Sequence, residues 1–432
     1  MELYQHLLKL QNAGKSIRVG LVGCGQMGSG MVHITRKMSG METVAIADVN
    51  PDRPIETFIS VGIPRSEIVV TSNYAVASDA LSKGKYLVTE DALLLTRLDY
   101  IDAVVEATGI TEIGAQVAWN CILNKKNITM LNVETDVTVG VFLNRMARKT
   151  GCVYTVAAGD EPAVCKMLYD FSSSMGFEVV CLGKGKNNVI NYEASPDSCR
   201  AEAESKNMNP KMLASFKDGT KTMVEMAAVS NATGLVPDIP GMHGPKVDLP
   251  DLTKYFIPQK DGGVLSKSGC VDYSTGNIAP GVFAIVTTDD PRIHADLRFV
   301  SMGNGPYYLF LRPFHLCNIE TPLAVAEAAI YGETTVVAKD MVSEVVSVAK
   351  RDLKAGEIIG GIGSADIFNR IYTYQDARAM KAIPMGIAPG ATILKDIPKG
   401  SPLTEDAVAP DTSKFVYQLR KMQDEMLHQT AA

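Results

Sequence analysis

The sequence contains no long apolar run. No segment of its 432 residues reaches the roughly 18 uninterrupted apolar residues that span a membrane. The N-terminal stretch, MELYQHLLKLQNAGKSIRVG, has no apolar core of the kind found in signal peptides. Its first dozen residues are typical of a short amphipathic helix. We therefore expect no membrane partner.

The sequence also lacks a basic surplus and a close pair of cysteines. Its 42 lysines and arginines against 48 aspartates and glutamates give a net charge of -6, which argues against broad nucleic-acid binding. A local basic pocket for an anionic substrate needs only a few residues. The eight cysteines include no C-x-x-C pair, so we expect reduced core thiols and a cytoplasmic protein.

The composition is that of a globular protein with a sizeable core, at 46% hydrophobic and 21% charged residues. The pattern of elements predicts an α/β fold in three parts. Residues 1–155 are expected to form a Rossmann domain that binds a dinucleotide. Residues 156–337 are expected to form an α+β catalytic and oligomerisation domain, and residues 338–432 a β-rich module with a final helix.

A glycine turn follows the first apolar strand, residues 17–22. It reads Gly23-Cys24-Gly25-Gln26-Met27-Gly28, a G-x-G-x-x-G motif. Such glycines permit a tight turn, close approach of a pyrophosphate and close helix packing, and the following helix then points its N-terminus at the phosphates. A glycine loop without a ligand is the alternative, and the residues that follow disfavour it.

An acidic residue stands at the position that contacts the adenosine ribose. Asp48 ends the second strand 20 residues after Gly28, and a carboxylate there repels a 2′-phosphate, which favours NAD over NADP. Arg53 tempers that preference. Two further strands, expected over 100–109 and 127–136, end near the cofactor. The predicted cofactor-binding residues are Gly23, Gly25, Gln26, Met27, Gly28, Asp48, Arg53, Thr108, Gly109, Asn132 and Glu134.

Two adjacent carboxylates open the middle of the chain. Gly159-Asp160-Glu161-Pro162 lies between a strand and a helix. Asp160 and Glu161 could bind a cation, act as acid or base, or simply favour the helix N-terminus. They are weak candidates for a divalent-metal site.

The stretch EVVCLGKGKNN predicts a strand with two lysines at its end. Alternation places Lys184 and Lys186 on one face, with Gly183 and Gly185 on the other, where another group can approach closely. The spacing does not fit a phosphate-binding P-loop. We interpret both lysines as groups that handle substrate charge.

A helical segment is expected over residues 197–215, and residues 218–229 are interpreted as a turn followed by a strand. Asp218-Gly219 is a turn signal, and the strand would carry Lys221 and Glu225 on one face. Charges inside an apolar strand need partners or water. The alternative is a solvated sheet face.

Three loop-rich segments, 231–245, 261–274 and 302–316, carry many polar side chains, as active-site loops do. Charge-assisted bonds to an anion are strong, so several of these residues suit a phosphate. The predicted catalytic residues are Lys184, Lys186, Lys221, Glu225, Lys267, Glu161 and His243. The predicted substrate-binding residues are Asn187, Asn188, Ser266, Ser268, Arg312, His315 and Asn231.

Residues 320–332 predict an apolar helix that can pack back on the first domain. Beyond residue 341, two similar stretches, KRDLKAGE and KDIPKGSPLT, predict short β segments with glycine turns. A helix is expected over 411–427. We interpret this module as a lid, a scaffold or an oligomerisation element.

The motifs resemble a known family. The glycine turn, the VVEATG strand and the α+β part resemble homoserine dehydrogenase, and the last module resembles an SAF domain. Together they resemble the DRL family, the 1-deoxy-D-xylulose 5-phosphate reductoisomerase-like enzymes of isoprenoid biosynthesis. The segments that carry this resemblance are AGDEP, GKGKNN, DGTKTMVEMAA, NATGLVPDI, GMHGP and GGVLSKSG.

The resemblance implies rearrangement of a ketose phosphate and its reduction with NADPH in a homo-oligomer, whereas Asp48 favours NAD. Homoserine dehydrogenases usually have an Asn-Lys pair after the strand at 127–132, with the lysine catalytic. Here Asn132 is followed by Val133 and Glu134, so that lysine is absent. Lys184, Lys186, Lys221 or Lys267 would then move the protons. Two alternatives stay open: an NAD-dependent dehydrogenase of a polyol, hydroxy acid or aldehyde, and a non-enzymatic dinucleotide-sensing or carbohydrate-binding protein.

Overall fold

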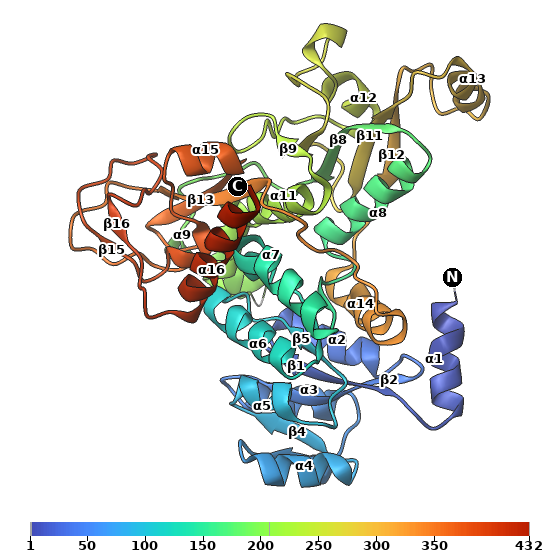
Figure 1. The fold of residues 1–432 in the computed structure, drawn as a ribbon, viewed down its shortest axis with the longest axis vertical. Coiled ribbons are helices and arrows are strands. Elements are labelled where there is room, and N and C mark those ends of the chain that lie inside the picture. Colours follow the sequence, from blue (N-terminus) through green and yellow to red (C-terminus); the bar gives the residue numbers. More distant parts are fainter. Residues whose placement is uncertain (1, 207, 432) are drawn as a thin grey trace. The chain divides into compact units, whose positions relative to one another are not determined.

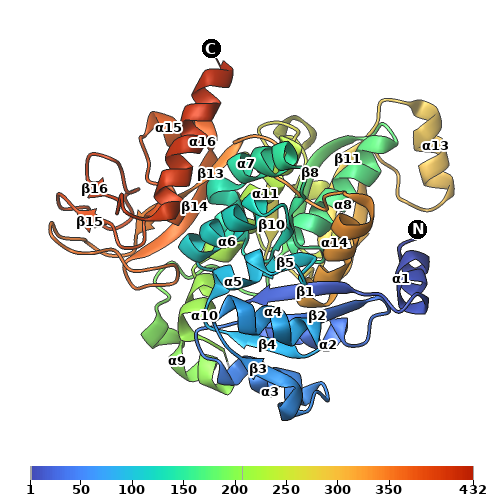
Figure 2. The same cartoon turned by 60° about the horizontal axis from the view of Figure 1, so that its bottom comes forward.

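The computed structural model describes residues 2–206 and 208–431, and the chain divides into two compact units. Unit 1 comprises Met1–Asp160, Leu316–Val337 and Ser413–Ala432. Unit 2 comprises Glu161–His315 and Ala338–Thr412. Most elements of both units are labelled in Figure 1 or Figure 2.

Unit 1 contains a seven-stranded parallel sheet in the order β3-β4-β2-β1-β5-β6-β7. Most strand residues are buried, as expected when helices cover both faces. Strands β2, β4 and β3 follow one another on one side of β1, and β5, β6 and β7 on the other side. This reversal of strand order marks the switch point of a Rossmann-like sheet. The strands are β1 (Ile17–Val22), β2 (Met41–Ala47), β3 (Ile68–Val70), β4 (Tyr86–Thr89), β5 (Ala103–Glu106), β6 (Asn127–Met130) and β7 (Tyr154–Val156).

The helices of unit 1 come from three parts of the sequence. Helix α14 packs against α2 and β6, and α16 packs against α6 and α7. The amide of Phe142 donates to Gln423 Oε1 at 3.0 Å, which ties α7 to α16. The helices are α1 (Leu3–Asn12), α2 (Gln26–Thr35), α3 (Asp52–Ser60), α4 (Tyr74–Ser82), α5 (Ala92–Arg97), α6 (Thr111–Leu123), α7 (Val133–Thr150), α14 (Cys317–Tyr331) and α16 (Phe415–Ala431), with a 3-10 turn at Arg65–Glu67.

Unit 2 contains a five-stranded sheet in the order β12-β11-β8-β10-β9. Strands β8, β9 and β10 are parallel, and β11 runs antiparallel to β8 and β12. Helices α8 (Glu161–Ser174) and α11 (Thr220–Thr233) pack together beside β8 and β10. The strands are β8 (Glu178–Gly185), β9 (Val236–Pro237), β10 (Cys270–Ser274), β11 (Val282–Thr287) and β12 (Tyr307–Arg312).

The later part of unit 2 contains the expected small β sheets. Strands β13 (Ser343–Ala349) and β14 (Ile367–Thr373) form one antiparallel pair and contact α11, and β15 (Thr392–Ile393) and β16 (Val408–Ala409) form another. The other helices are α9 (Pro196–Ser205), α10 (Pro210–Lys217), α12 (Leu252–Tyr255), α13 (Pro291–Phe299) and α15 (Tyr374–Ala379), with 3-10 turns at Leu249–Asp251, Gln259–Asp261 and Met385–Ile387.

The strand predicted after Asp218-Gly219 is wrong, because residues 220–233 form helix α11. Gly219 and Gly234, both at positive φ, bound the helix. Nearly every residue of α11 is buried, so no polar face revealed the helical period.

Three other boundaries also differ from the expectations. The strand expected over 127–136 ends at Met130, and its polar end belongs to α7. The segments expected to be loops at 261–274 and 302–316 contain β10 and β12. The helix expected over 197–215 is two helices, α9 and α10, and residue 207 lies outside the described residues.

Candidate active site

A buried ammonium group lies at the centre of the candidate site. Lys184, near the end of β8, donates from Nζ to Glu161 Oε1 and to Glu225 Oε2. Glu161 is the first residue of α8, and Glu225 lies in the second turn of α11. All three side chains are less than a tenth exposed. The sequence thus brings three predicted catalytic residues into direct contact.

The protonation of Lys184 follows from these contacts. Burial by itself lowers the pKa of Lys184, but the negative charges of Glu161 and Glu225 outweigh it and raise that pKa above its ordinary value. Burial, together with the charge of Glu161, raises the pKa of Glu225. An ammonium group has three N–H donors. The third donor of Lys184 has no partner among the residues that the structure describes, so it is available to a ligand.

Lys221 adjoins the same carboxylate. Its Nζ lies 4.0 Å from Glu225 Oε1, one helical turn away on α11. The sequence placed this pair on one face of a strand, whereas the structure places it on one face of a helix. The two residues are therefore neighbours, although the local structure is different.

Lys186 follows the end of β8 and has a different environment. Its Nζ donates to the Phe216 carbonyl at 2.7 Å and to Asn188 Oδ1 at 2.9 Å. Burial, and then the charge of Lys184, lower the pKa of Lys186 to about 8. A neutral amine has two N–H groups, and these two acceptors satisfy both. With a pKa of about 8 the amine is mostly protonated at pH 7, and in its neutral form its lone pair can take a proton.

His315 joins the site through Glu161. Its Nδ1 lies 2.8 Å from the Pro280 carbonyl, which can only accept, so Nδ1 carries a proton. Its Nε2 lies 3.4 Å from Glu161 Oε1. His315 therefore contacts the same carboxylate that holds Lys184.

Other groups of the protein occupy the space beside the two glycines of the lysine strand. A Cβ on Gly183 would lie 2.4 Å from the Phe283 ring, and one on Gly185 would lie 2.2 Å from the Ala279 amide nitrogen. The close approach predicted from these glycines is therefore made by internal groups.

His243 belongs to a second polar cluster. Its Nε2 lies 2.9 Å from Asp238 Oδ2, and Ser266 donates its amide to the same carboxylate at 3.0 Å. The backbone amides of His243 and Gly244 donate to Asp272. Burial raises the pKa of Asp272 to about 6, although these amides oppose the shift.

Strand register separates this cluster from Lys184. Asp272 pairs with Gly183, and Tyr273 pairs with Lys184. Paired residues share a face and successive residues alternate, so Asp272 lies on the opposite face of the sheet from Lys184.

The other predicted catalytic and substrate-binding residues are dispersed. Arg312 pairs with Val282, which also pairs with Lys184, so Arg312 lies level with Lys184 two strands away, about 10 Å. Lys267 and Ser268 precede β10 and lie toward the opposite end of the sheet from Lys184. Asn231 accepts from the amides of Val342 and Ser343, each at 2.8 Å. Asn187 is exposed beside Lys186.

The glycine turn of unit 1 has the geometry of a dinucleotide loop. Gly23 has φ +94°, and a Cβ on Gly28 would lie 2.1 Å from the Gly23 carbonyl. Gly25 has open space around its missing Cβ, and α2 begins at Gln26. Met27 is exposed. The turn therefore requires glycine at two positions and leaves its outer side open to a phosphate.

Asp48 braces this turn. Its Oδ2 accepts from the Cys24 amide at 2.7 Å, and its Oδ1 accepts from the Asn50 amide at 2.9 Å. Arg53 Nη1 lies 3.8 Å from Oδ1, and the Arg53 side chain is 58% exposed. Both residues thus stand at the C-terminal edge of β2, where the ribose of a dinucleotide binds.

The neighbouring strand ends supply further predicted cofactor residues. Thr108 donates its amide to Glu106 Oε1 at 3.0 Å, and Gly109 has φ +69°. Asn132 caps α7 by accepting from the Thr135 amide at 3.1 Å. Glu134 is buried in the first turn of α7.

Sequence reasoning missed Glu106, at the end of β5. Burial raises the pKa of Glu106 to about 7, although hydrogen bonds from Thr108 oppose the shift. Its Oε2 is buried and has no hydrogen-bond partner among the described residues. A carboxylate in an otherwise apolar strand was the available signal.

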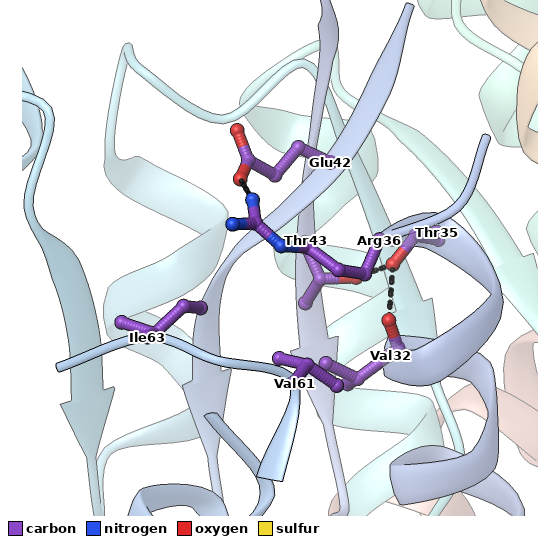
Figure 3. A pocket seen from close by; sticks show the side chains of 7 residues that line it. All are labelled: Val32, Thr35, Arg36, Glu42, Thr43, Val61 and Ile63. Atoms are coloured by element: carbon purple, nitrogen blue, oxygen red, sulfur yellow. Dashed lines mark hydrogen bonds and ion pairs between the residues drawn. The ribbon is translucent and has the colours of Figure 1, made fainter. Parts of the chain in front are cut away.

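A hollow in unit 1, shown in Figure 3, is distinct from these sites. Arg36 Nη1 donates to Glu42 Oε1 at 2.9 Å across it. Glu42 lies near the start of β2, at the opposite edge of the sheet from Asp48. The lining residues are Val32, Thr35, Arg36, Glu42, Thr43, Val61 and Ile63, none of which is a predicted site residue.

Two global expectations bear on the class of protein. None of the helices in the described ranges is long and apolar enough to cross a membrane. Each of the eight cysteines lies among the described residues and forms no disulfide there, and all but Cys317 are buried.

Residues 159–321 match a family model described as oxidoreductase DRL, catalytic domain. The match covers the segment that carries Glu161, Lys184, Lys186, Glu225 and His315. It confirms the resemblance to the DRL family and indicates an oxidoreductase. No curated protein matches the sequence.

Solved structures show more distant likenesses. A probable dehydrogenase from Thermotoga maritima is 13% identical with a TM-score of 0.41, over 73% of this chain and 90% of that chain. A DOX-P reductoisomerase in complex with magnesium is 13% identical with a TM-score of 0.41, over 74% and 70% of the two chains. A scyllo-inositol dehydrogenase from Lactobacillus casei, with bound NAD(H) and scyllo-inositol, is 15% identical with a TM-score of 0.33, over 64% and 67%. Likenesses at this level do not bear on the activity of this chain.

Proposed function

We propose that this protein is a nicotinamide-dependent oxidoreductase that rearranges and reduces a small hydroxy-carbonyl compound, specifically a ketose phosphate. The observation that carries the proposal is the pair of lysines at the end of β8. Lys184 is held as an ammonium between Glu161 and Glu225, and the pKa of Lys186 is lowered to about 8. The DRL match over residues 159–321 supports the same class of reaction.

The dinucleotide fits the glycine turn of unit 1. Gly23 and Gly28 make the tight turn, Gly25 leaves room for the pyrophosphate, and Asp48 lies at the ribose position. When bound, the nicotinamide supplies or accepts the hydride at the carbonyl carbon. Asp48 favours NAD, and the exposed guanidinium of Arg53 offers a partner for the 2′-phosphate of NADP.

Lys184 would stabilise negative charge on the substrate oxygen. Its raised pKa keeps it protonated, so it acts as a hydrogen-bond donor and not as a base. Two of its donors fix its position through Glu161 and Glu225, and the third can point to an oxyanion. A buried, preorganised donor of this kind is typically worth about 10²–10³ in rate.

Lys186 would move the hydroxyl proton. As a neutral amine, it accepts the proton of a substrate hydroxyl at Nζ as an enediolate or retro-aldol step begins, and it returns the proton afterwards. The bonds to Phe216 and Asn188 orient the lone pair.

A divalent metal fits this centre poorly. The space between Glu161 Oε1 and Glu225 Oε2 already holds the Lys184 ammonium, so a metal ion would have to displace it. The other candidate metal ligand, Asp160, belongs to unit 1, where its Oδ1 accepts a hydrogen bond from Cys317 Sγ at 3.3 Å. We therefore assign the charge-stabilising role to Lys184.

A substrate panel tests the proposal. Purified protein is incubated with 1-deoxy-D-xylulose 5-phosphate and NADPH or NADH, and oxidation of the cofactor is followed by absorbance. We expect turnover in wild type and a loss of two or more orders of magnitude in Lys184→Met. Cofactor binding with no turnover on any phosphorylated or unphosphorylated hydroxy-carbonyl compound would contradict it and favour a dinucleotide-sensing or carbohydrate-binding role.

A second candidate function is an NAD-dependent dehydrogenase of a polyol, hydroxy acid or aldehyde without rearrangement. The buried position of Asp48 against the glycine turn favours it, since a carboxylate there selects NAD. NAD-dependent oxidation of a simple alcohol, with deoxyxylulose phosphate inert, would establish this function in place of the first.

The division of labour remains part of the proposal. Residues 1–155 would bind the dinucleotide, 156–337 would carry catalysis, and 338–432 would support the catalytic part. We also propose a cytoplasmic homo-oligomer.

A further inference from the structure

One arginine of the C-terminal segment has no counter-charge. Arg370 lies in β14, and its side chain forms no ion pair or hydrogen bond within residues 2–206 and 208–431. Its Nε is buried without a hydrogen-bond partner. Leaving a buried donor unpaired is costly, so we expect the Nε of this half-buried side chain to serve a ligand. Arg351 of the same segment shows the usual arrangement, with Glu357 and Asp366 at 2.5 and 2.7 Å.

Aromatic rings hold the Arg370 guanidinium in place. Its Cζ lies 5.3 Å from the centre of the Phe368 ring and 5.5 Å from that of Tyr192. These two rings are themselves in contact, with centroids 4.4 Å apart. Stacking fixes the plane of a guanidinium and leaves its in-plane N–H groups free to bind an anion at two points. The side chain is therefore preorganised for a phosphate or carboxylate.

A short loop connects Arg370 with the candidate active site. A Cβ on Gly241 would lie 3.2 Å from the Arg370 side chain, and the Gly241 amide donates to the Ile371 carbonyl at 2.8 Å. At the other end of the loop, a Cβ on Gly244 would lie 2.1 Å from the Tyr273 hydroxyl. Tyr273 is the register partner of Lys184, so their side chains share one face of the sheet.

The residues around this loop belong to one unit. Tyr192 follows the segment that carries Lys186 and Asn188, and the loop 241–244 joins the Arg370 side chain to Tyr273. A substrate whose carbonyl end lies at Lys184 can thus extend an anionic end along Tyr273 toward Arg370. None of the residues that the sequence predicted to bind phosphate lies beside the loop 241–244 as Arg370 does.

We propose that Arg370 binds the anionic group of the substrate, a phosphate or a carboxylate. The C-terminal segment then takes part directly in substrate binding. This inference rests on the proposed function, because it names the residue that would recognise the charged end of that substrate.

Binding of inorganic phosphate tests the proposal without turnover or cofactor. Phosphate is titrated into wild type, Arg370→Met, Arg370→Gln and the control Arg351→Met, and binding is followed by ³¹P line broadening. We expect both Arg370 variants to weaken phosphate binding at least about tenfold, the loss typical of a charge-assisted bidentate contact. Arg351→Met, which removes an arginine already neutralised by carboxylates, should bind phosphate as wild type does.

Melting temperatures separate a binding role from a structural one. If Arg370 serves a ligand, replacing an unpaired buried donor keeps or raises the melting temperature while phosphate binding is lost. Unchanged phosphate binding in Arg370→Gln would overturn the proposal, as would phosphate inhibition that does not compete with the sugar phosphate. Loss of turnover in Lys184→Met with phosphate binding intact concerns the proposed function and leaves this one standing.

Discussion

Lys184 and Lys186 are separated by a single glycine, yet their environments shift the pKa values of their amines in opposite directions. Lys184 lies between two carboxylates, and its pKa is raised. Lys186 faces a carbonyl and an amide oxygen, and burial with the repulsion of Lys184 lowers its pKa to about 8. The pair therefore combines a permanent positive charge with an amine that can exchange protons near neutral pH.

Turnover should depend on the protonation of Lys186. If Lys186 acts as a base, the rate rises with pH and levels off above about pH 8, because its pKa is lowered to about 8. Lys186→Met should lower kcat by about 10²–10⁴ and remove this dependence. A pH–rate profile of both proteins is the measurement. Lys206→Met, which removes an exposed lysine, is the control, and a loss below tenfold in Lys186→Met would place the residue outside the reaction.

Removing the charge of Lys184 should shift the pH dependence of Lys186 upward. The Lys184 ammonium lowers the pKa of Lys186, whereas Glu161 and Glu225 raise it. Lys184→Met removes the lowering effect and leaves the carboxylates in place, so the pKa of Lys186 should rise. The pH dependence of Lys186 acylation, followed by mass spectrometry, should move to higher pH. A midpoint that does not move would show that the two amines are uncoupled.

The same substitution should destabilise the protein. Lys184→Met leaves two buried carboxylates without their partner, a change that typically costs about 3–5 kcal/mol. The double variant Lys184→Met with Glu225→Gln removes one of those charges and should recover part of the loss. Urea unfolding of the wild type and the variants measures the effect, and equal stability of the single and double variants would contradict it.

Asp48 should control cofactor choice. Asp48→Ala removes the carboxylate that favours NAD and that braces the Cys24 amide. We expect the ratio of kcat/KM for NAD to that for NADP to fall, with Arg53 assisting the 2′-phosphate. Arg53→Ala should shift the ratio in the opposite direction. A ratio unaffected by Asp48→Ala would remove the argument for NAD.

Glu106 should make stability depend on pH. Burial raises its pKa to about 7, so between about pH 4.5 and pH 7 the folded protein binds more protons than the unfolded one. Stability is then present at low pH and is lost as the pH rises through 7. Glu106→Gln should stabilise the protein above pH 7 by ~1–3 kcal/mol. Melting temperatures at pH 5 and pH 8 measure this, with Glu90→Gln, at an exposed position, as a control.

Local pattern was enough to predict the parallel sheet and glycine turn of unit 1 and the lysine strand of unit 2. Alternation and glycine spacing are properties of adjacent residues, so β8, the glycine turn and Asp48 could be placed in advance. Helix α11 could not, because burial on all sides hides its period and makes Lys221 and Glu225 look like residues of a strand. Partners distant in sequence were also hidden: Glu161 and Glu225 meet at Lys184 only through the packing of α8 on α11. Arg370 gave no signal, since the lack of a counter-charge among the described residues depends on the folded arrangement and not on adjacent sequence.

The three-part origin of unit 1 has a consequence for synthesis of the protein on the ribosome. The Phe142 amide donates to the Gln423 side chain, and α14, which begins at residue 317, packs on α2 and β6. While residues 1–160 emerge, those apolar surfaces are uncovered and those amides unpaired. A fragment cut after Asp160 should therefore aggregate when expressed alone, and unit 1 should become resistant to protease only after residues 413–431 have left the exit tunnel.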